Sequence, residues 1–201
     1  IYVVGQIDSS NIYTSSLNVM AGYLMHDLPI DSSFKVTYGV RFEKAQMLYT
    51  GQRQTVENPE TDIFNEDVVL DDLDILPSIA AVYAVNKDIN IRANYAKTLA
   101  RPSFKEKSGA EIYDAVTQIT FLGNLDLVAT KIDNFDLRIE KFMKGADLIS
   151  LTGFYKQFTN PIEVVAFSED APDNITPRNV DKATVVGIEL EIRKSLEFVY
   201  E

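Results

Sequence analysis

The 201-residue chain contains no cysteine and no tryptophan, and it has a single histidine, His26. The absence of cysteine excludes disulfides and thiolate metal sites. With one histidine and no cysteine, a zinc site is not expected, and a Ser-His-Asp triad would have to use His26. We therefore expect no catalytic residues, no metal site and no cofactor, and no residue is assigned to ligand binding.

The chain also lacks a basic excess, because its formal net charge is −11. Nucleic-acid-binding proteins normally present a basic patch, so we expect no nucleic-acid partner. No apolar run approaches the roughly 20 residues that a transmembrane helix needs. Membrane β-strands stay open, since they cross in about 9–11 residues with only alternate positions apolar. No signal peptide opens the chain at Ile1, so an exported protein would have to begin upstream.

Apolar and polar residues alternate with period two along several segments, and helical periodicity is scarce. The clearest segment is 34–43, and others begin near residues 89, 134 and 186. The alternation predicts an all-β chain with one apolar and one polar face. The expected apolar face includes Val36, Val40, Ile91, Leu137, Ile139, Ile188 and Leu190, with the aromatic residues Tyr23, Tyr38, Phe42, Tyr83, Tyr95 and Phe135. The expected polar face includes Arg41, Arg92, Arg138, Glu140 and Glu189.

Short and long connections alternate strictly between these segments. The short ones are expected at residues 27–34, 86–88, 144–146 and 194–195, and the long ones at 51–74, 101–131 and 160–181. Outer-membrane barrels show this pattern, with short periplasmic turns and longer extracellular loops. A Greek-key sandwich has no reason to produce it.

Three segments resemble the TonB-dependent receptor family. Residues 21–44 are similar to a hairpin whose second strand carries Gly-Val-Arg-x-Glu, here Gly39 to Glu43. Ala-Arg-Pro-Ser-Phe at residues 100–104 resembles a motif at which a barrel strand enters an extracellular loop. The third segment, residues 123–137, is similar to a Gly-Asn-Pro-x-Leu motif followed by a strand, although Leu125 replaces the proline.

The resemblance implies an antiparallel up-and-down outer-membrane β-barrel, here partial, with about eight strands of a larger 22-stranded barrel. Residues 1–201 would be a fragment of that barrel domain, and the plug domain would be absent. It implies a Gram-negative outer-membrane location and energy-coupled uptake of a scarce nutrient, such as a siderophore, vitamin or glycan, without enzyme activity. The implied partners are the imported ligand, held by extracellular loops, outer-membrane lipid, and TonB through the missing N-terminal part. A surface lipoprotein is a further candidate partner.

Two other classes stay open. A soluble all-β binding module of a secreted bacterial protein would need strands of ordinary length and no alternation of loop lengths. An all-β glycoside hydrolase would need two carboxylates that converge from different strands. The candidate pairs are Asp133 with Asp136 and Glu189 with Glu191, and placement along a strand explains both without catalysis.

Single residues carry more local expectations. Pro102 cannot donate a ladder hydrogen bond, so strand pairing should stop there, and we expect Arg101 to form a rim salt bridge rather than a ligand contact. Gly123 and Asn124 suit a turn with a positive backbone angle. Gly187 is expected to mark a bend or the close approach of another backbone.

The long connections contain two further features. A short helix is expected at residues 110–116. An acidic group is expected to lie in a solvated loop rather than to bind calcium, because its spacing matches no EF-hand. This group comprises Glu66, Asp67, Asp71, Asp72 and Asp74.

Overall fold

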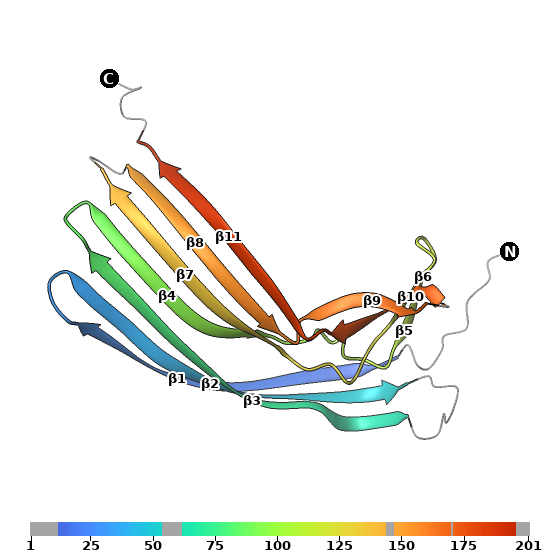
Figure 1. The fold of residues 1–201 in the computed structure, drawn as a ribbon. Coiled ribbons are helices and arrows are strands. Elements are labelled where there is room, and N and C mark those ends of the chain that lie inside the picture. Colours follow the sequence, from blue (N-terminus) through green and yellow to red (C-terminus); the bar gives the residue numbers. More distant parts are fainter. Residues whose placement is uncertain (1–11, 54–61, 144–146, 170, 196–201) are drawn as a thin grey trace.

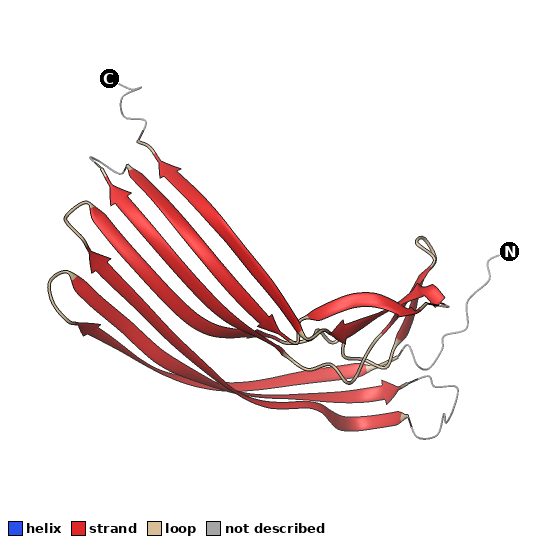
Figure 2. Cartoon of the chain, viewed as in Figure 1, coloured by secondary structure: helices blue, strands red, loops and turns tan. Residues whose placement is uncertain are grey.

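The computed structural model describes residues 12–53, 62–143, 147–169 and 171–195. In this part of the chain, strands form two sheets, and most of the remaining residues lie in turns (Figure 1, Figure 2). No helix occurs among these residues, so none is long and apolar enough to cross a membrane. The prediction of an all-β chain is confirmed.

The larger sheet has seven strands, and each pairs antiparallel with its neighbours in the order β1-β2-β3-β4-β7-β8-β11. Figure 1 shows this sheet as a curved, open wall, as expected for part of an up-and-down barrel. The strands are β1 (Thr14–Pro29), β2 (Phe34–Gln52), β3 (Ile63–Ala84), β4 (Ile89–Ala100), β7 (Thr130–Phe142), β8 (Leu148–Thr159) and β11 (Lys182–Arg193).

The smaller sheet lies at the end of the wall opposite the short turns (Figure 1). Its order is β5-β6-β10-β9, and β6 and β10 pair in parallel. The β4–β7 connection supplies β5 (Glu111–Asp114) and β6 (Ile119–Leu122), and the β8–β11 connection supplies β9 (Ile162–Ser168) and β10 (Ala171–Asn179). The helix expected at residues 110–116 is wrong. Ile112 and Tyr113, which favour strands, pair with Phe121 and Thr120 instead.

The register assigns each side chain of the wall to a face, because paired residues of an antiparallel ladder point to the same side. One paired row runs Val36, Ala81, Ala93, Leu137, Gly153 and Ile188. A row on the opposite side runs Val82, Arg92, Arg138, Thr152 and Glu189. The expected separation of apolar from charged side chains is confirmed. Tyr23 is an exception, because it pairs with Arg41 and lies on the charged face.

Side-chain hydrogen bonds fix two of the short turns. The Asp31 carboxylate accepts hydrogen bonds from the Ser33 hydroxyl (2.7 Å) and from the backbone N–H groups of Ser33 (2.6 Å) and Phe34 (2.8 Å), which hold the pKa of Asp31 below its usual value. Asn86 accepts hydrogen bonds from the N–H groups of Asp88 and Ile89 in the same way. Such Asx turns make tight hairpins. The third expected turn, at residues 144–146, lies outside the described residues. β11 ends at Arg193 and the described residues end at Ser195, so the turn expected at 194–195 stays a prediction.

The first long connection is shorter than expected, because β2 continues to Gln52 and β3 already begins at Ile63. The acidic residues expected in a solvated loop therefore lie on β3. Alternation separates them: Asp71 pairs with Lys44 on the outward face at 2.5 Å, whereas Asp74 points inward and is 5% exposed. The other long connections remain outside the wall, but each contains strands of the smaller sheet.

Candidate functional site

The wall forks between β3 and β4. β4 pairs with β3 only from Ser78 to Ala84, although the pairing of β3 with β2 extends up to Ile63. Figure 1 shows β1 to β3 diverging there from the other strands of the wall. β4 ends at Ala100, one residue before Arg101 and two before Pro102, as the loss of a backbone donor at proline predicts.

Ion pairs join the two sides of this fork. Arg101 comes from the β4 side and donates through Nη2 to Glu43 Oε2 (2.8 Å) and to Asp74 Oδ2 (3.3 Å), which lie on β2 and β3. Lys131, at the start of β7, also pairs with Asp74. Arg41 holds the other oxygen of Glu43 at 2.6 Å. The rim salt bridge predicted for Arg101 is confirmed, and it joins parts of the wall that no backbone ladder connects.

A second network covers the inner face of β4, β7 and β11. Glu140 accepts from Arg92 (2.7 Å) and Arg138 (2.8 Å), and Arg138 also donates to Glu191 (2.6 Å). Arg193 reaches the same Glu191 at 3.0 Å. Each of these carboxylates is therefore shared by two guanidinium groups. The inner wall is a surface of paired charges.

The proposed hydrolase pairs do not converge. Asp133 pairs with Lys97 on the outward face and accepts a hydrogen bond from the Tyr95 hydroxyl at 2.7 Å, whereas Asp136 points inward. Glu189 lies on the same face as Glu191, and Glu191 is already paired with Arg138 and Arg193. A retaining or inverting pair needs two carboxyl groups that flank one bond from different elements, and these residues do not supply it.

The connection between β4 and β7 packs onto the inner side of β2. The backbone N–H of Gly109 donates to the hydroxyl of Tyr49, which is fully buried, at 2.9 Å. Gly123 packs so closely on this segment that an added Cβ would lie 2.3 Å from the Ser108 carbonyl oxygen. The turn with a positive backbone angle expected at Gly123 and Asn124 is wrong, since neither φ lies in that range. Glycine is required by the close approach.

Lys107 is buried inside the same connection and is 2% exposed. Its ammonium group donates to the carbonyl oxygens of Leu125 and Leu127, both at 2.5 Å. Burial lowers the pKa of this amine, although the nearby carboxylates of Asp126 and Asp72 oppose the shift. Because Asp72 belongs to β3, the buried charge connects the loop to the wall. The sequence holds no signal for this role, since Lys107 resembles any other loop lysine.

Two asparagines lock the long connections together. Asn124 donates through its amide to the carbonyl of Pro177 (3.0 Å) and accepts from the N–H of Asp126 (3.0 Å). Asn179 accepts from the N–H of Val128 (2.9 Å) and donates to the Asn160 carbonyl (2.7 Å). The Gly-Asn motif of the third family-like segment is thus the point where the two connections meet.

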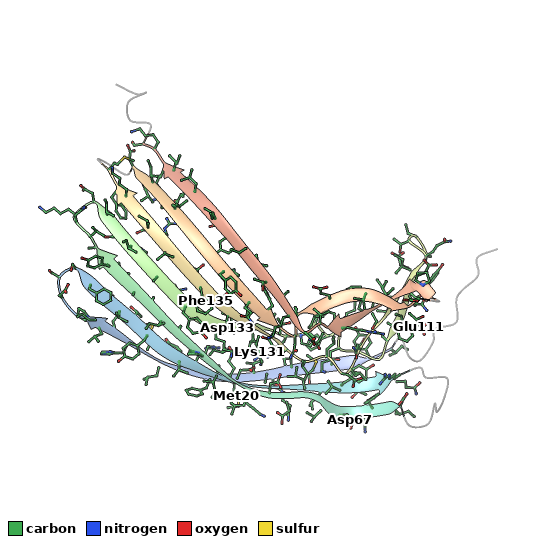
Figure 3. All side chains as sticks on the ribbon, in the orientation of Figure 1. Met20, Asp67, Glu111, Lys131, Asp133 and Phe135 are labelled. Carbon is green, nitrogen blue, oxygen red and sulfur yellow. The ribbon has the colours of Figure 1, made fainter. Side chains whose placement is uncertain are left out.

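The layer made by the smaller sheet leaves several side chains exposed, among them Tyr113, Val116, Val164 and Phe167. Its cations are engaged internally. Lys105 lies 4.3 Å from the centre of the Phe121 ring, and Arg178 donates to the Phe167 carbonyl at 3.1 Å. Figure 3 shows Glu111 at this end of the molecule, away from Phe135 on the wall. No three metal-ligating side chains come together within the described residues.

The two remaining residues considered in the sequence, His26 and Gly187, pack against aromatic side chains. His26 lies on the outward face, where its ring packs edge-on against Tyr38 at 5.5 Å between centroids. Gly187 lies opposite Phe154, and an added Cβ would lie 2.4 Å from that ring. The close approach expected at Gly187 therefore exists, but a side chain makes it rather than a backbone.

The model of the family described as TonB dependent receptor-like, beta-barrel, matches residues 2–200. The chain belongs to the TonB-dependent receptor family. Its partial barrel is the fold of Gram-negative outer-membrane proteins, and the outer membrane is where this receptor barrel lies. Family membership excludes the alternative of a soluble binding module.

Three solved receptors share the fold. The siderophore receptor PirA from Pseudomonas aeruginosa is 18% identical, with 92% of this chain and 41% of that chain covered and a TM-score of 0.56. The Serratia marcescens hemophore receptor HasR, solved with its hemophore HasA and heme, is 14% identical, with 88% and 31% covered and a TM-score of 0.70. The Ferric-Catecholate import receptor Fiu from Escherichia coli K12 is 15% identical, with 92% and 26% covered and a TM-score of 0.59.

The chain thus spans between about a quarter and two fifths of the length of these solved receptors. No curated protein sequence matches the chain.

Proposed function

We propose that this chain is part of a receptor that imports a scarce nutrient across the outer membrane, with energy supplied through TonB, and that the receptor catalyses no covalent change. The observation that carries the proposal is the layer clamped onto one end of a charge-paired wall by Lys107, Asn124 and Asn179. Binding residues on loops held by a rigid scaffold are typical of ligand capture.

In this proposal residues 1–201 are a segment of the barrel domain of a longer receptor. An N-terminal plug would fill the lumen and contact TonB, and the long connections would face the outside. A surface lipoprotein that covers the loops stays a candidate partner. The paired guanidinium and carboxylate groups of the inner wall support this arrangement, because they offer a polar surface for a plug to contact while leaving no charge on Glu140 or Glu191 uncompensated.

We propose three classes of imported ligand: a siderophore, a vitamin or a glycan. The solved receptors named above include siderophore, ferric-catecholate and heme-hemophore receptors, and this supports testing iron sources first. Capture of a bulky chelate requires an exposed surface at the end of the barrel, and the layer of β5, β6, β9 and β10 offers one, with Tyr113, Val116, Val164 and Phe167 exposed.

Uptake by whole cells tests the proposal. Cells with and without the full-length receptor gene are given a radiolabelled ferric catecholate, heme, cobalamin or an oligosaccharide, with and without a proton uncoupler. We expect one of these ligands to accumulate only in energised cells that carry the gene. Accumulation at an unchanged rate after the proton gradient collapses would show that the receptor is a passive pore.

A further inference from the structure

The outward face of β3, β4, β7, β8 and β11 is hollowed by a trough of about 670 Å³. Its floor follows the paired row of Ala81, Ala93, Leu137, Gly153 and Ile188, in which Ala81, Ala93 and Gly153 are small. One bank is the next row towards the long connections, where the Tyr95 and Phe135 rings lie 4.9 Å apart and Phe135 and Tyr155 lie 6.2 Å apart. Figure 3 labels Phe135 on this part of the wall.

The position of the trough relative to the membrane follows from the next row. Beyond the aromatic bank the outward face becomes polar, with Lys97, Asp133 and Gln157 paired side by side. Rows of aromatic residues at the edge of the apolar band mark the membrane interface of barrels. The trough therefore lies just inside the hydrocarbon region, on the side of the long connections.

The residues that line the trough indicate what kind of molecule can fill it. Its side chains are almost entirely hydrocarbon, and the hydroxyl of Tyr95 is already bonded to Asp133. Asn94 and Asp136 contribute to the lining, but their positions in the ladder direct their side chains inward. No charged side chain of the outward rows lines the trough, and apart from the Tyr95 hydroxyl the Tyr155 hydroxyl is the one hydrogen-bonding group that these rows contribute to the lining. A lining of this kind fits a flexible apolar chain better than a polar protein surface.

The direction of the trough also fits such a chain. The paired rows run across the strands, and strands of membrane barrels tilt by about 35–45° from the membrane normal. The trough is then inclined by roughly 50° to the normal and crosses five strands, a span of about 19 Å at about 4.8 Å per strand. We propose that it holds one acyl chain of a lipid from the membrane leaflet on the side of the long connections.

The preference for the trough over the open bilayer comes from packing. In a membrane the competing solvent is other acyl chains, so transfer from water contributes nothing, and association depends on van der Waals contact. A chain in the trough contacts the floor and the aromatic bank, whereas a chain on a flat wall contacts one side only, and each additional close contact contributes attraction. The proposal rests on the membrane location of the barrel and is independent of what the receptor imports.

Two glycines on the outward face provide a matched test. Gly153 lies in the trough and Gly22 lies on β1 outside it, and at both an added Cβ meets nothing within 4 Å. Gly153→Leu should fill the trough, while Gly22→Leu adds the same side chain to the same face elsewhere. The full-length receptor and both variants are extracted with outer-membrane lipid in mild detergent, and native mass spectrometry counts the bound lipids and the protein copies per particle.

We expect the fraction of receptor that retains one lipid to fall roughly tenfold in Gly153→Leu, equivalent to about 1.4 kcal/mol, and to stay unchanged in Gly22→Leu. Equal retention in the two variants, or equal loss, would overturn the proposal. A wild-type dimer that Gly153→Leu converts to a monomer would also overturn it, because the trough would then bind a second copy. Should Gly153→Leu fail to assemble, Ala93→Leu fills the same floor and is read in the same way.

Discussion

Arg101 is the residue whose removal tests the fork of the wall most sharply. In Arg101→Ala, Glu43 and Asp74 each lose one of two cations, since Arg41 and Lys131 remain. The three side chains are 14%, 13% and 5% exposed, so water compensates poorly for the lost hydrogen bonds. β3 and β4 share no backbone ladder beyond Ser78, and the cluster is the polar connection across that gap.

The size of the stability loss in Arg101→Ala follows from the burial of these side chains. Removing one partner of a buried ion pair costs about 3–5 kcal/mol, and the surviving cation on each carboxylate reduces this to about 2–3 kcal/mol. Arg193 provides a matched control, because it also pairs with a carboxylate, Glu191, at 3.0 Å, but the two side chains are 63% and 41% exposed. For Arg193→Ala we expect about 0–1 kcal/mol.

The assay is the denaturant-induced unfolding of the full-length receptor folded in lipid vesicles, followed by the mobility shift between folded and unfolded barrel. Arg101→Ala should lower the free energy of unfolding by about 2–3 kcal/mol relative to the wild type. If Arg101→Ala proves no more destabilising than Arg193→Ala, the cluster does not hold the fork and the reasoning is refuted.

Four further substitutions test other parts of the structure. Gly123→Ala should loosen the layer, because its Cβ would lie 2.3 Å from the Ser108 carbonyl oxygen, and limited proteolysis should then cut residues 101–130 faster while the barrel stays folded. Burial lowers the pKa of Lys107, so the unfolded layer binds this proton more tightly than the folded layer does. Hydrogen-exchange protection of residues 123–128 should therefore rise with pH through the interval just below the usual lysine pKa, and this dependence should vanish in Lys107→Met. Leu137→Lys on the outward face should cost about 2–4 kcal/mol of barrel stability, and Ala80→Lys on the inward face should cost much less; equal costs would contradict the facing.

Period-two alternation was sufficient to predict the wall, because the lipid-facing and inward-facing rows must differ in polarity wherever a strand crosses the membrane. Val36, Leu137 and Ile188 were assigned correctly for this reason. Tyr23 was not, since an aromatic ring suits either face of a barrel. Alternation did not predict the part of β3 from Ile63 to Asp74. The outward face of this part carries the Lys44–Asp71 ion pair, so it does not require a row of apolar side chains.

The layer above the wall was beyond prediction for another reason. Its strands are short, and β6 pairs with β10, which lies more than 50 residues away in the sequence. Local pattern carries no information about such a partner, so residues 110–116 were assigned to a helix. The roles of Lys107, Asn124 and Asn179 depend on backbone carbonyls brought close by the fold. Of the candidate site, Arg101 could be anticipated because its neighbour Pro102 fixes the end of the strand, and Arg92, Arg138 and Glu140 could be anticipated because alternation places them on the polar face.

The central claim, that this chain is the wall of an outer-membrane barrel with lipid on one face, is tested most directly by spin labels on β7. The 201 residues contain no cysteine, so single cysteines can be placed one at a time at residues 135 to 140 of the full-length receptor in vesicles, after any cysteine elsewhere in the receptor has been replaced by serine. Positions 135, 137 and 139 should be accessible to oxygen dissolved in lipid, and positions 136, 138 and 140 should be shielded from it. Absence of this alternation, or its reversal, would contradict the account.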